Sequence, residues 1–579
     1  MSRLGEIQPM PLTGERRISN GVLMLLAAGA NLVFLCALLK VFMPTYEIND
    51  DMFISMFIDG QMANKSNFVL FCNYFLAVPL RWLYDLSGNA YPIYSYFQYA
   101  LLFLSFTGIS YILLRRCDFF VALAAAACVL GSFAADCYIY LSYTKTASIA
   151  ATAGILLMFF ARNRQTGGVE ARAAQVFGIG LSVLSSVLRS ESFAMVLALM
   201  FPMGLYELFI YLKGRQNKLK AAFSYSLPFL IMLAIAAGAY GGNELIWRQS
   251  PYREYKEFIY SVRELTDYHR SLNTYDTMPQ EYDAMGLSPE ICNMALNYCG
   301  FDDTDIWNTQ VCRQVVEARD KQGLYPNFQE LLKTYAGCWR DFTGYRFFWG
   351  FIMAGLLWLF LAKHNRYRLL VLLSQLLIFS CMYLILIYLE RYMFGRVDIG
   401  LFMPVMACFL WQMDKRKVAK WRCGLCLLAA LLSAPICYYQ YRFYQPPWTG
   451  IENMEYTTYQ IETLMEDEHL FLVGNMALNL QTCSPLEPMP QGYRDKLYFS
   501  GGWVVRHPQV MELLSGYGLE NPYRDAIDND KVYVIPNDID ELMRYIKHYY
   551  DEDAEALLIP ELSNKVGIDI YRLVSRDAG

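Results

Sequence analysis

Histidine and charged residues are both scarce in this chain. Five histidines occur among 579 residues, scattered at positions 269, 364, 469, 507 and 548, so the sequence has no histidine-rich metal site. Charged residues make up 18% of the chain and hydrophobic residues 55%, which is too apolar for an ordinary soluble enzyme of this length. The composition therefore predicts a polytopic α-helical membrane protein.

The chain also lacks internal repeats, low-complexity tracts and a second cysteine pair near Cys423 and Cys426. A lone CxxC that opens an apolar run does not predict a zinc site. The N-terminus is polar, and the first apolar run is long and has no small-residue cleavage site. We therefore expect a retained membrane anchor and no cleaved signal peptide.

Long apolar runs recur along the whole chain. A helix of about 17–25 apolar residues is long enough to cross a bilayer core. Such runs occur at about 20–45, 95–114, 119–138, 141–161, 176–188, 192–212, 221–247, 347–362, 369–389, 400–413 and 423–441. We predict about eleven transmembrane helices.

Basic residues gather in alternate loops. Six segments hold 20 Lys and Arg against 5 Asp and Glu: 1–19, 115–118, 162–175, 213–221, 363–368 and 414–422. By the positive-inside rule these segments face the cytoplasm, and so does the N-terminus. The intervening long segments carry a combined charge of −20, which argues against a nucleic-acid partner.

The predicted organisation has five parts. They are a cytoplasmic N-terminus (1–19), a membrane core (20–246) with a first outer loop (45–94), an outer helical insertion (247–345), C-terminal membrane helices (346–441) and an outer α/β domain (442–579). We expect the first outer loop to lie on the membrane, with helices over 51–61 and 71–84. Four insertion cysteines at an oxidising face predict one or two disulfides: Cys292, Cys299, Cys312 and Cys338.

Three carboxylates, Glu47, Asp50 and Asp51, follow the first apolar run almost directly. Carboxylates are costly to hold near hydrocarbon, so such a placement usually marks a site. The predicted topology puts further charged residues at the same outer level: Asp136, Lys145, Arg189, Glu191, Glu390, Arg391, Arg396 and Asp398. The whole set therefore converges on one face of the membrane.

Two interpretations of this charged set stay open. Pairs such as Arg189 with Glu191, or Glu390 with Arg391, would simply hold helix ends together. Alternatively, the set lines a pocket for a substrate with a phosphate and a hydroxyl, because arginine binds phosphate and a carboxylate acts as general base. We favour the pocket, with Arg189 facing inward at a tight hairpin between two helices.

The layout resembles the GT-C superfamily of membrane glycosyltransferases, which use polyprenyl-phosphate-linked sugars. The resemblance rests on the Asn49-Asp50-Asp51 motif in the first outer loop, the interfacial helices, the multi-helix core and the C-terminal outer domain. More narrowly, the segments 144–147, 188–191 and 501–503 look like those of a group of uncharacterised bacterial membrane proteins. The resemblance implies a bacterial cytoplasmic membrane, a lipid-linked sugar donor and a glycan or lipid acceptor.

The resemblance also implies inverting transfer, with Asp50 or Asp51 as the general base, and we favour Asp50. The expected substrate-binding and phosphate-binding residues are Glu47, Lys145, Arg189, Glu191, Arg391 and Arg396. Some superfamily members use a divalent cation and others do not. If a metal binds here, carboxylates such as Asp50 or Asp51 hold it, which favours Mg or Mn.

Three other interpretations remain open from the sequence, and one of them is a degenerate, non-catalytic scaffold. A surface polysaccharide polymerase or ligase would also carry outer arginines, although an acidic pair so soon after the first helix is not expected there. A transporter or flippase of lipid-linked glycans would show broken helices near the midplane and often inverted repeats, and neither is visible. The turn Gly501-Gly502-Trp503 presents an aromatic ring, for which packing is favoured over sugar stacking.

Overall fold

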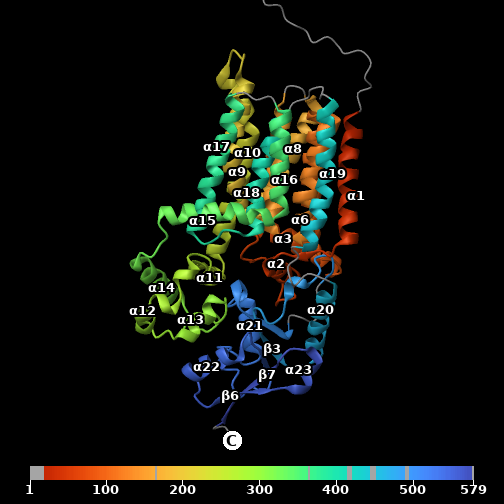
Figure 1. The fold of residues 1–579 in the computed structure, drawn as a ribbon. Coiled ribbons are helices and arrows are strands. Elements are labelled where there is room, and N and C mark those ends of the chain that lie inside the picture. The colour runs from red at the N-terminus through yellow and green to blue at the C-terminus, as the bar shows by residue number, and fades with distance from the viewer. Residues whose placement is uncertain are drawn as a thin grey trace, which may run out of the picture.

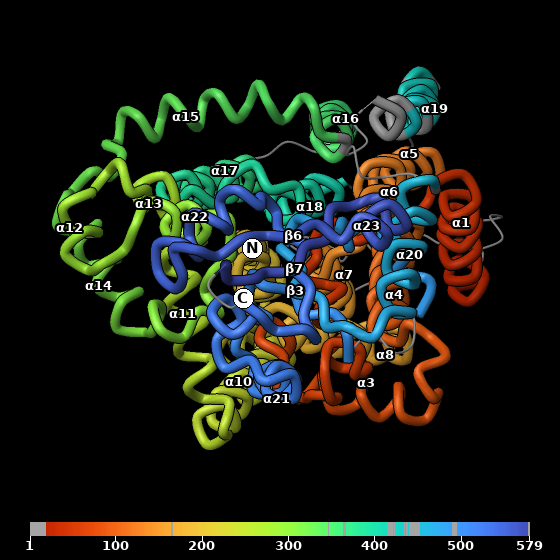
Figure 2. Tube along the Cα trace, turned by 90° about the horizontal axis from the view of Figure 1, so that it is seen from below, coloured from red at the N-terminus to blue at the C-terminus, as the bar shows by residue number. Residues whose placement is uncertain are grey.

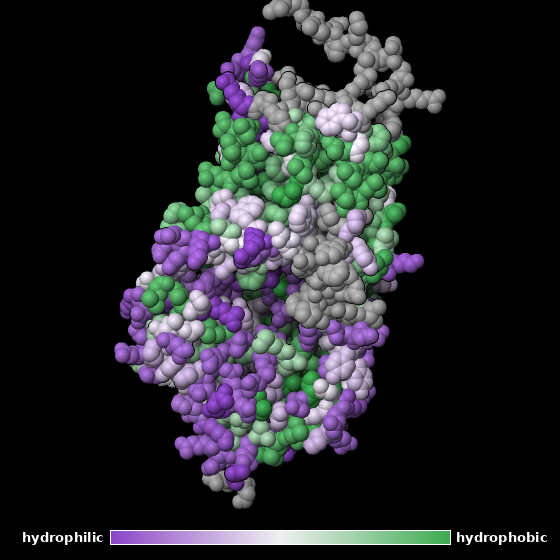
Figure 3. All heavy atoms as spheres, viewed as in Figure 1, coloured by the Kyte–Doolittle hydropathy of each residue, from purple (hydrophilic) through white to green (hydrophobic). Residues whose placement is uncertain are grey.

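The computed structural model of the protein describes residues 19–163, 166–362, 366–413, 420–443, 451–488 and 495–576. Long helices form a bundle, and two folded parts, a helical insertion and a C-terminal α/β domain, sit together at one end of it (Figure 1). We call this the domain-bearing end. Hydrophobic side chains collect over the bundle and hydrophilic ones over the two folded parts (Figure 3), so the protein is an integral membrane protein.

Each predicted apolar run corresponds to a helix of the bundle. These helices are α1 (Asn20–Val41), α4 (Ile93–Arg116), α5 (Phe119–Val129), α6 (Ala135–Ile139), α7 (Tyr143–Arg162), α8 (Gly168–Leu188), α9 (Ser190–Leu212), α10 (Lys218–Gln249), α16 (Arg346–Leu361), α17 (Arg366–Tyr388), α18 (Gly395–Trp411) and α19 (Lys420–Phe443). A π-helical turn, Leu130–Ala134, joins α5 to α6, so these two helices make one continuous span.

The number of crossings stays a prediction. Within the described residues, eight helices are long and apolar enough to span a membrane, and a ninth is added if α15 and α16 count as one bent span. The predicted runs at 347–362 and 400–413 form α16 and α18, which have only 16 and 17 residues. The predicted class, a polytopic helical membrane protein with a helical insertion and a C-terminal α/β domain, is confirmed.

The first loop differs from its prediction in one respect. It forms α2 (Asn49–Asp59), which ends at Gly60 with φ +87°, and α3 (Tyr74–Ser87). Every residue of α2 from Asp51 to Asp59 is buried, so the prediction that this helix lies on the membrane surface is wrong. Only α3 keeps exposed apolar side chains, among them Trp82 and Leu86, as an interfacial helix does.

The insertion consists of helices that flank the C-terminal domain. They are α11 (Arg253–Thr266), α12 (Pro279–Ala284), α13 (Pro289–Leu296), α14 (Thr309–Gln322) and α15 (Phe328–Asp341). Figure 2 shows α15 running along one side of the molecule towards α16. All four insertion cysteines are buried free thiols, so the predicted disulfides are wrong, and these side chains serve as small core residues.

The C-terminal domain is a five-stranded sheet with helices, and it lies below the centre of the bundle (Figure 2). Its elements are α20 (Ile451–Glu466), β3 (Leu470–Gly474), β4 (Leu497–Ser500), α21 (Pro508–Gly516), β5 (Val532–Ile535), α22 (Ile539–Tyr549), β6 (Ala554–Leu558), α23 (Pro560–Val566) and β7 (Tyr571–Ser575). The strand order is β4-β3-β5-β7-β6. The first strand, β3, therefore lies between two parallel neighbours, β4 and β5.

Candidate active site

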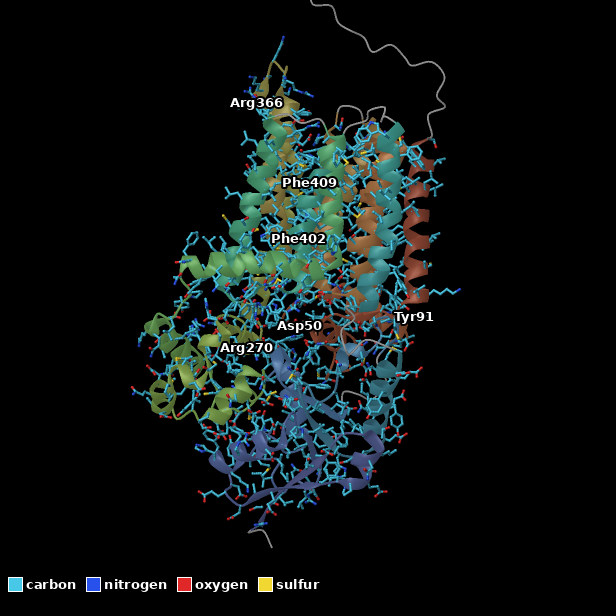
Figure 4. All side chains as sticks on the ribbon, in the orientation of Figure 1. Asp50, Tyr91, Arg270, Arg366, Phe402 and Phe409 are labelled. Carbon is cyan, nitrogen blue, oxygen red and sulfur yellow. The ribbon has the colours of Figure 1, made fainter. Side chains whose placement is uncertain are left out.

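A cavity of about 260 Å³ lies where the bundle, the insertion and the C-terminal domain meet. Figure 4 shows Asp50 at this junction, whereas Phe402 and Phe409 lie inside the bundle. Six charged side chains line the cavity: Asp50, Arg189, Arg263, Asp267, Arg391 and Arg396. They come from α2, the α8–α9 break, α11 and the residue after it, the loop after α17 and the first turn of α18, so the fold brings together residues that are far apart in the sequence.

Asp50 is the only residue of the acidic motif whose carboxylate lines the cavity together with Arg189 and Arg396. Its Oδ1 accepts a hydrogen bond of 3.0 Å from the indole Nε1 of Trp503. Burial raises the pKa of Asp50 above its ordinary value, while Arg396 and Arg189 oppose this increase by favouring the charged form. The carboxylate is thus held in place and retains a second oxygen for a ligand.

Trp503 packs against aromatic side chains of the first loop and positions the Asp50 carboxylate. The ring is 6% exposed and lies among Phe53, Phe57 and Phe71, with ring centroids 5.4 to 6.2 Å away. Tyr255 of α11 donates its hydroxyl to the Trp503 carbonyl at 2.5 Å. The C-terminal domain therefore fixes the Asp50 carboxylate through one aromatic side chain.

The four arginines outnumber the two carboxylates. Asp267 is within 3.4 Å of Arg263 and 3.3 Å of Arg391, and Arg189 donates to the hydroxyl of Tyr143 at 2.7 Å. Arg396 makes no hydrogen bond or ion pair within the described part of the chain, and its guanidinium faces the Phe394 ring at 5.1 Å. The cavity therefore has a surplus of positive charge that suits an anionic group such as phosphate.

Local backbone conformation determines where the cavity arginines lie. The helices α8 and α9 are separated by Arg189 alone, whose backbone is extended (φ −155°, ψ 99°), as the predicted hairpin requires. In the loop after α17, Glu390 and Met393 both have positive φ, near 58°, which is costly for non-glycine residues. Ser271 of the insertion donates to Glu390, and Tyr345 donates to the Met393 carbonyl, so contacts on both sides hold the strained loop.

Asp51 faces away from the cavity. The residue is fully buried, and its Oδ1 accepts hydrogen bonds from Tyr94 (3.1 Å), Gln98 (2.8 Å) and the backbone N–H of Tyr143 (2.9 Å). Burial raises the pKa of Asp51 to about 8. Since Tyr143 begins α7, Asp51 fastens α2 to the N-terminus of α7.

Glu47 and Lys145 do not line the cavity either. The Lys145 ammonium is 1% exposed and lies 2.9 Å from Glu47 and 2.5 Å from Asp136. This cluster lies beside the two-residue pairing of β1 (Thr45–Tyr46) with β2 (Tyr140–Leu141). The structure therefore places both residues in an internal ion network outside the cavity, and the phosphate-binding role predicted for them stays a prediction.

The remaining charged candidates lie at the rim or elsewhere. Glu191 does not line the cavity. Its side chain is 63% exposed and pairs with Arg189 at 3.2 Å, so Arg189 makes this ion pair and also lines the cavity. The Glu390 carboxylate bonds to Ser271, and Arg391 pairs with Asp267, so these neighbours do not form the pair considered from sequence.

Sequence reasoning missed several lining residues. Arg263 lies in α11, Asp267 directly follows it, and Tyr298 follows α13. Asn475 also lines the cavity. It directly follows β3, the central parallel strand, and ligands of open α/β sheets bind at the carboxyl ends of such strands. A polar residue at that position was therefore the available signal.

The donor set does not fit a divalent cation. Among the described residues, no group of three or more His, Cys, Asp or Glu side chains is placed to hold a metal. The cavity offers Asp50 and Asp267 among four arginines, whereas Mg and Mn prefer several oxygen ligands without competing cations.

No protein-family model matches the chain, and no curated protein matches it in sequence. Two solved structures are similar in fold over nearly their whole length. ArnT from Cupriavidus metallidurans bound to undecaprenyl phosphate has 11% identity and a TM-score of 0.40, with 96% of this chain and 98% of that chain covered. The apo state of the same ArnT has 10% identity and a TM-score of 0.35 over the same shares. Both TM-scores are low, so these two structures say nothing about the role of the residues that line the cavity.

Proposed function

We propose that the protein is a membrane glycosyltransferase that moves a sugar from a polyprenyl-phosphate donor to an acceptor hydroxyl. One observation carries this proposal: a partly buried carboxylate, Asp50, shares a cavity beside the membrane bundle with four guanidinium groups. A base and a phosphate-binding surface in one enclosure are what transfer from a sugar phosphate requires. The sequence resemblance to GT-C glycosyltransferases points to the same chemistry.

The proposed step is a single displacement with inversion. Asp50 accepts the proton of the acceptor hydroxyl as its oxygen forms a bond to the anomeric carbon. The bond between that carbon and the phosphate oxygen breaks, and the electron pair leaves on polyprenyl phosphate. Arg396, Arg189 and Arg391 stabilise the charge that develops on the departing phosphate, and the surplus of guanidinium groups matches this charge.

We further propose that the domain-bearing end faces outward from a bacterial cytoplasmic membrane. The support is the distribution of basic residues, because Arg115 and Arg116 end α4 and Arg162 ends α7 at the opposite end of the bundle. Alkaline phosphatase fused to the C-terminus, which is active only outside the cytoplasm, should be active in whole cells. A stable fusion without alkaline phosphatase activity would instead place the C-terminal domain in the cytoplasm and contradict the proposed orientation.

Asp50→Asn is the direct test of the mechanism. The amide keeps an oxygen for the Trp503 indole but accepts no proton, so transfer from a labelled undecaprenyl-phosphate sugar should fall by about 10²–10⁴-fold. Binding of undecaprenyl phosphate should persist. The matched control is Asp59→Asn, a second buried carboxylate of α2 that does not line the cavity, and it should retain activity.

The pH profile sharpens this test. The pKa of Asp50 is raised by burial, so the rate should fall as the pH decreases through that raised pKa and the base becomes protonated. Full activity of a folded Asp50→Asn protein would rule out the general base.

A further inference from the structure

A group of four uncharged residues in mutual contact lines part of the cavity. We call this group the neutral wall and define it by Asn49, Tyr298, Asn475 and Gly502. Two of these residues, Asn475 and Gly502, follow β3 and β4 of the C-terminal domain, and Tyr298 belongs to the insertion. The arginines come instead from α11, the loop after α17 and the ends of the bundle helices, so charged residues and neutral polar residues reach the cavity from different elements.

The topology of the sheet determines where the neutral wall lies. Asn475 leaves the carboxyl end of β3, the central strand of three parallel ones, where the chain connections diverge and ligand crevices form. Asn537, which follows β5, accepts the backbone N–H of Met476 at 2.9 Å. Gly474 allows this approach, because a Cβ there would lie 2.4 Å from the Asn537 Oδ1.

A second glycine, Gly501, allows the neutral wall to pack closely against the insertion. A Cβ on Gly501 would lie 2.7 Å from the Cβ of Asn475 and 2.9 Å from the Tyr298 carbonyl oxygen. Gly502 then donates its N–H to that carbonyl at 2.8 Å. The close approach therefore fixes the spacing between Asn475 and Tyr298 across the domain boundary.

The amides of the neutral wall have unused hydrogen-bonding capacity. Asn49 donates to Asn475 Oδ1 at 3.3 Å, and no other side-chain hydrogen bond of either residue occurs within the described part of the chain. The pair therefore offers the Asn475 amide N–H groups as donors and the Asn49 carbonyl oxygen as an acceptor. A donor beside an acceptor matches neighbouring hydroxyl groups of a sugar ring, and the arginines favour anions instead.

We propose that the neutral wall is the sugar subsite, and that Asn475 distinguishes sugars by the configuration of their hydroxyl groups. This inference rests on the proposed function, in which the phosphate occupies the arginine side. The volume of about 260 Å³ lies just below the usual range for small-molecule sites, which begins at about 300 Å³, so the cavity suits a sugar phosphate rather than two whole substrates. A site that hydrogen-bonds a hydroxyl strongly rejects an analogue without it.

The test measures binding of defined lipids to the purified full-length protein. The probes are bare undecaprenyl phosphate and undecaprenyl phosphate carrying glucose, galactose, mannose or xylose. The wild type should prefer one sugar over its epimers by at least about tenfold. Asn475→Ala should reduce this ratio to nearly one while binding of the bare lipid stays within about twofold, because the arginines are intact.

Two variants accompany Asn475→Ala. Asn479→Ala removes an exposed asparagine four residues further along, outside the cavity, and should keep the wild-type preference. Gly501→Ala should lower the preference as well, since the added Cβ forces Asn475 away from Tyr298.

The outcomes separate this inference from the proposed function. An unchanged sugar preference in a folded Asn475→Ala protein would overturn the subsite, and so would equal loss of the bare lipid. Equal wild-type affinity for all sugars and the bare lipid would also overturn the subsite while leaving phosphate binding intact. Failure of the wild type to bind any probe, the bare lipid included, would refute the proposed function itself.

Discussion

Two charged clusters lie at the domain-bearing end, and they differ in what their charges face. The closed cluster (Glu47, Asp136 and Lys145) holds a lysine that is 1% exposed, with carboxylates 2.9 and 2.5 Å away. The cavity cluster (Asp50, Arg189, Arg263, Asp267, Arg391 and Arg396) surrounds open space and leaves Arg396 without an ion pair among the described residues. In the closed cluster the lysine is paired with carboxylates of the same cluster. In the cavity cluster the arginines outnumber the carboxylates, which leaves a surplus of positive charge.

This difference shows what identifies a site among charges near a membrane. Each of these residues is costly beside hydrocarbon, and on that criterion Lys145 and Arg396 are equivalent. A buried ion pair is compensated by its partners, so its residues hold the structure together. The surplus positive charge next to the cavity has no such internal compensation, which is why we propose that an anionic ligand supplies it.

The largest expected effect comes from Lys145→Gln, which opens the closed cluster. Removal of the cation leaves Glu47 and Asp136 facing each other without a counter-charge, and loss of one partner from a buried pair costs about 3–5 kcal/mol. We expect the free energy of unfolding in detergent to decrease by that amount. Lys65→Gln, which removes an ion pair whose side chains are 23% and 52% exposed, should cost less than about 1 kcal/mol.

A double variant checks the cause of that loss. Adding Asp136→Asn to Lys145→Gln removes one of the two uncompensated charges and should recover part of the stability. If Lys145→Gln instead unfolds like the wild type but loses undecaprenyl phosphate, Lys145 belongs to the ligand site and the distinction between the clusters fails.

Arg396→Gln should weaken ligand binding and leave stability unchanged, which is the opposite of Lys145→Gln, and its free-energy effect should be smaller. Since Arg396 has no ion pair within the described residues, its replacement should leave thermal unfolding almost unchanged. A hydrogen bond to a charged group contributes about 1.5–3 kcal/mol, so binding of undecaprenyl phosphate should weaken about 10- to 100-fold. Arg396→Lys should be intermediate, because an ammonium keeps the charge without the planar fork.

The matched control is Arg340→Gln, which removes a guanidinium that is 85% exposed and lies outside the cavity. Equal affinity of the Arg396→Gln and Arg340→Gln proteins for the lipid would remove Arg396 from the phosphate site.

Periodicity and composition could predict the fold because hydrophobic burial in a membrane follows from local sequence. Each apolar run became a bundle helix, and the break at Arg189 was visible as an interruption of a long run. Strand β4 is difficult to predict because its four residues, Leu497–Ser500, carry too little pattern. Burial of α2 was missed, since its cover is the C-terminal domain, more than 400 residues away in the chain.

The site could be predicted only in part. The acidic motif and the arginines were visible because charge is rare beside apolar runs. Which charge faces the cavity depends on tertiary contacts, since Asp50 and Asp51 are adjacent in sequence but point to Trp503 and Gln98 respectively. Asn475 carries no charge, so only the topology of the sheet indicates it.

Asp51→Asn should have the smallest effect on transfer activity, and it tests where the cavity cluster ends. Burial raises the pKa of Asp51 to about 8, whereas the unfolded chain has a value near 3.9. The folded state therefore holds a proton that the unfolded state has released between about pH 4 and pH 8, so this group's contribution is full below about pH 4 and is lost as the pH rises through 8. The asparagine has no such proton.

Thermal unfolding at pH 5, 7 and 8.5 should therefore show the wild type losing stability relative to Asp51→Asn as the pH increases. Transfer activity should stay within a few-fold, because Asp51 bonds to Tyr94 and Gln98 and does not line the cavity. Parallel unfolding curves together with a loss of activity as large as that of Asp50→Asn would place Asp51 in the reaction, and the boundary drawn here between structural and catalytic carboxylates would be wrong.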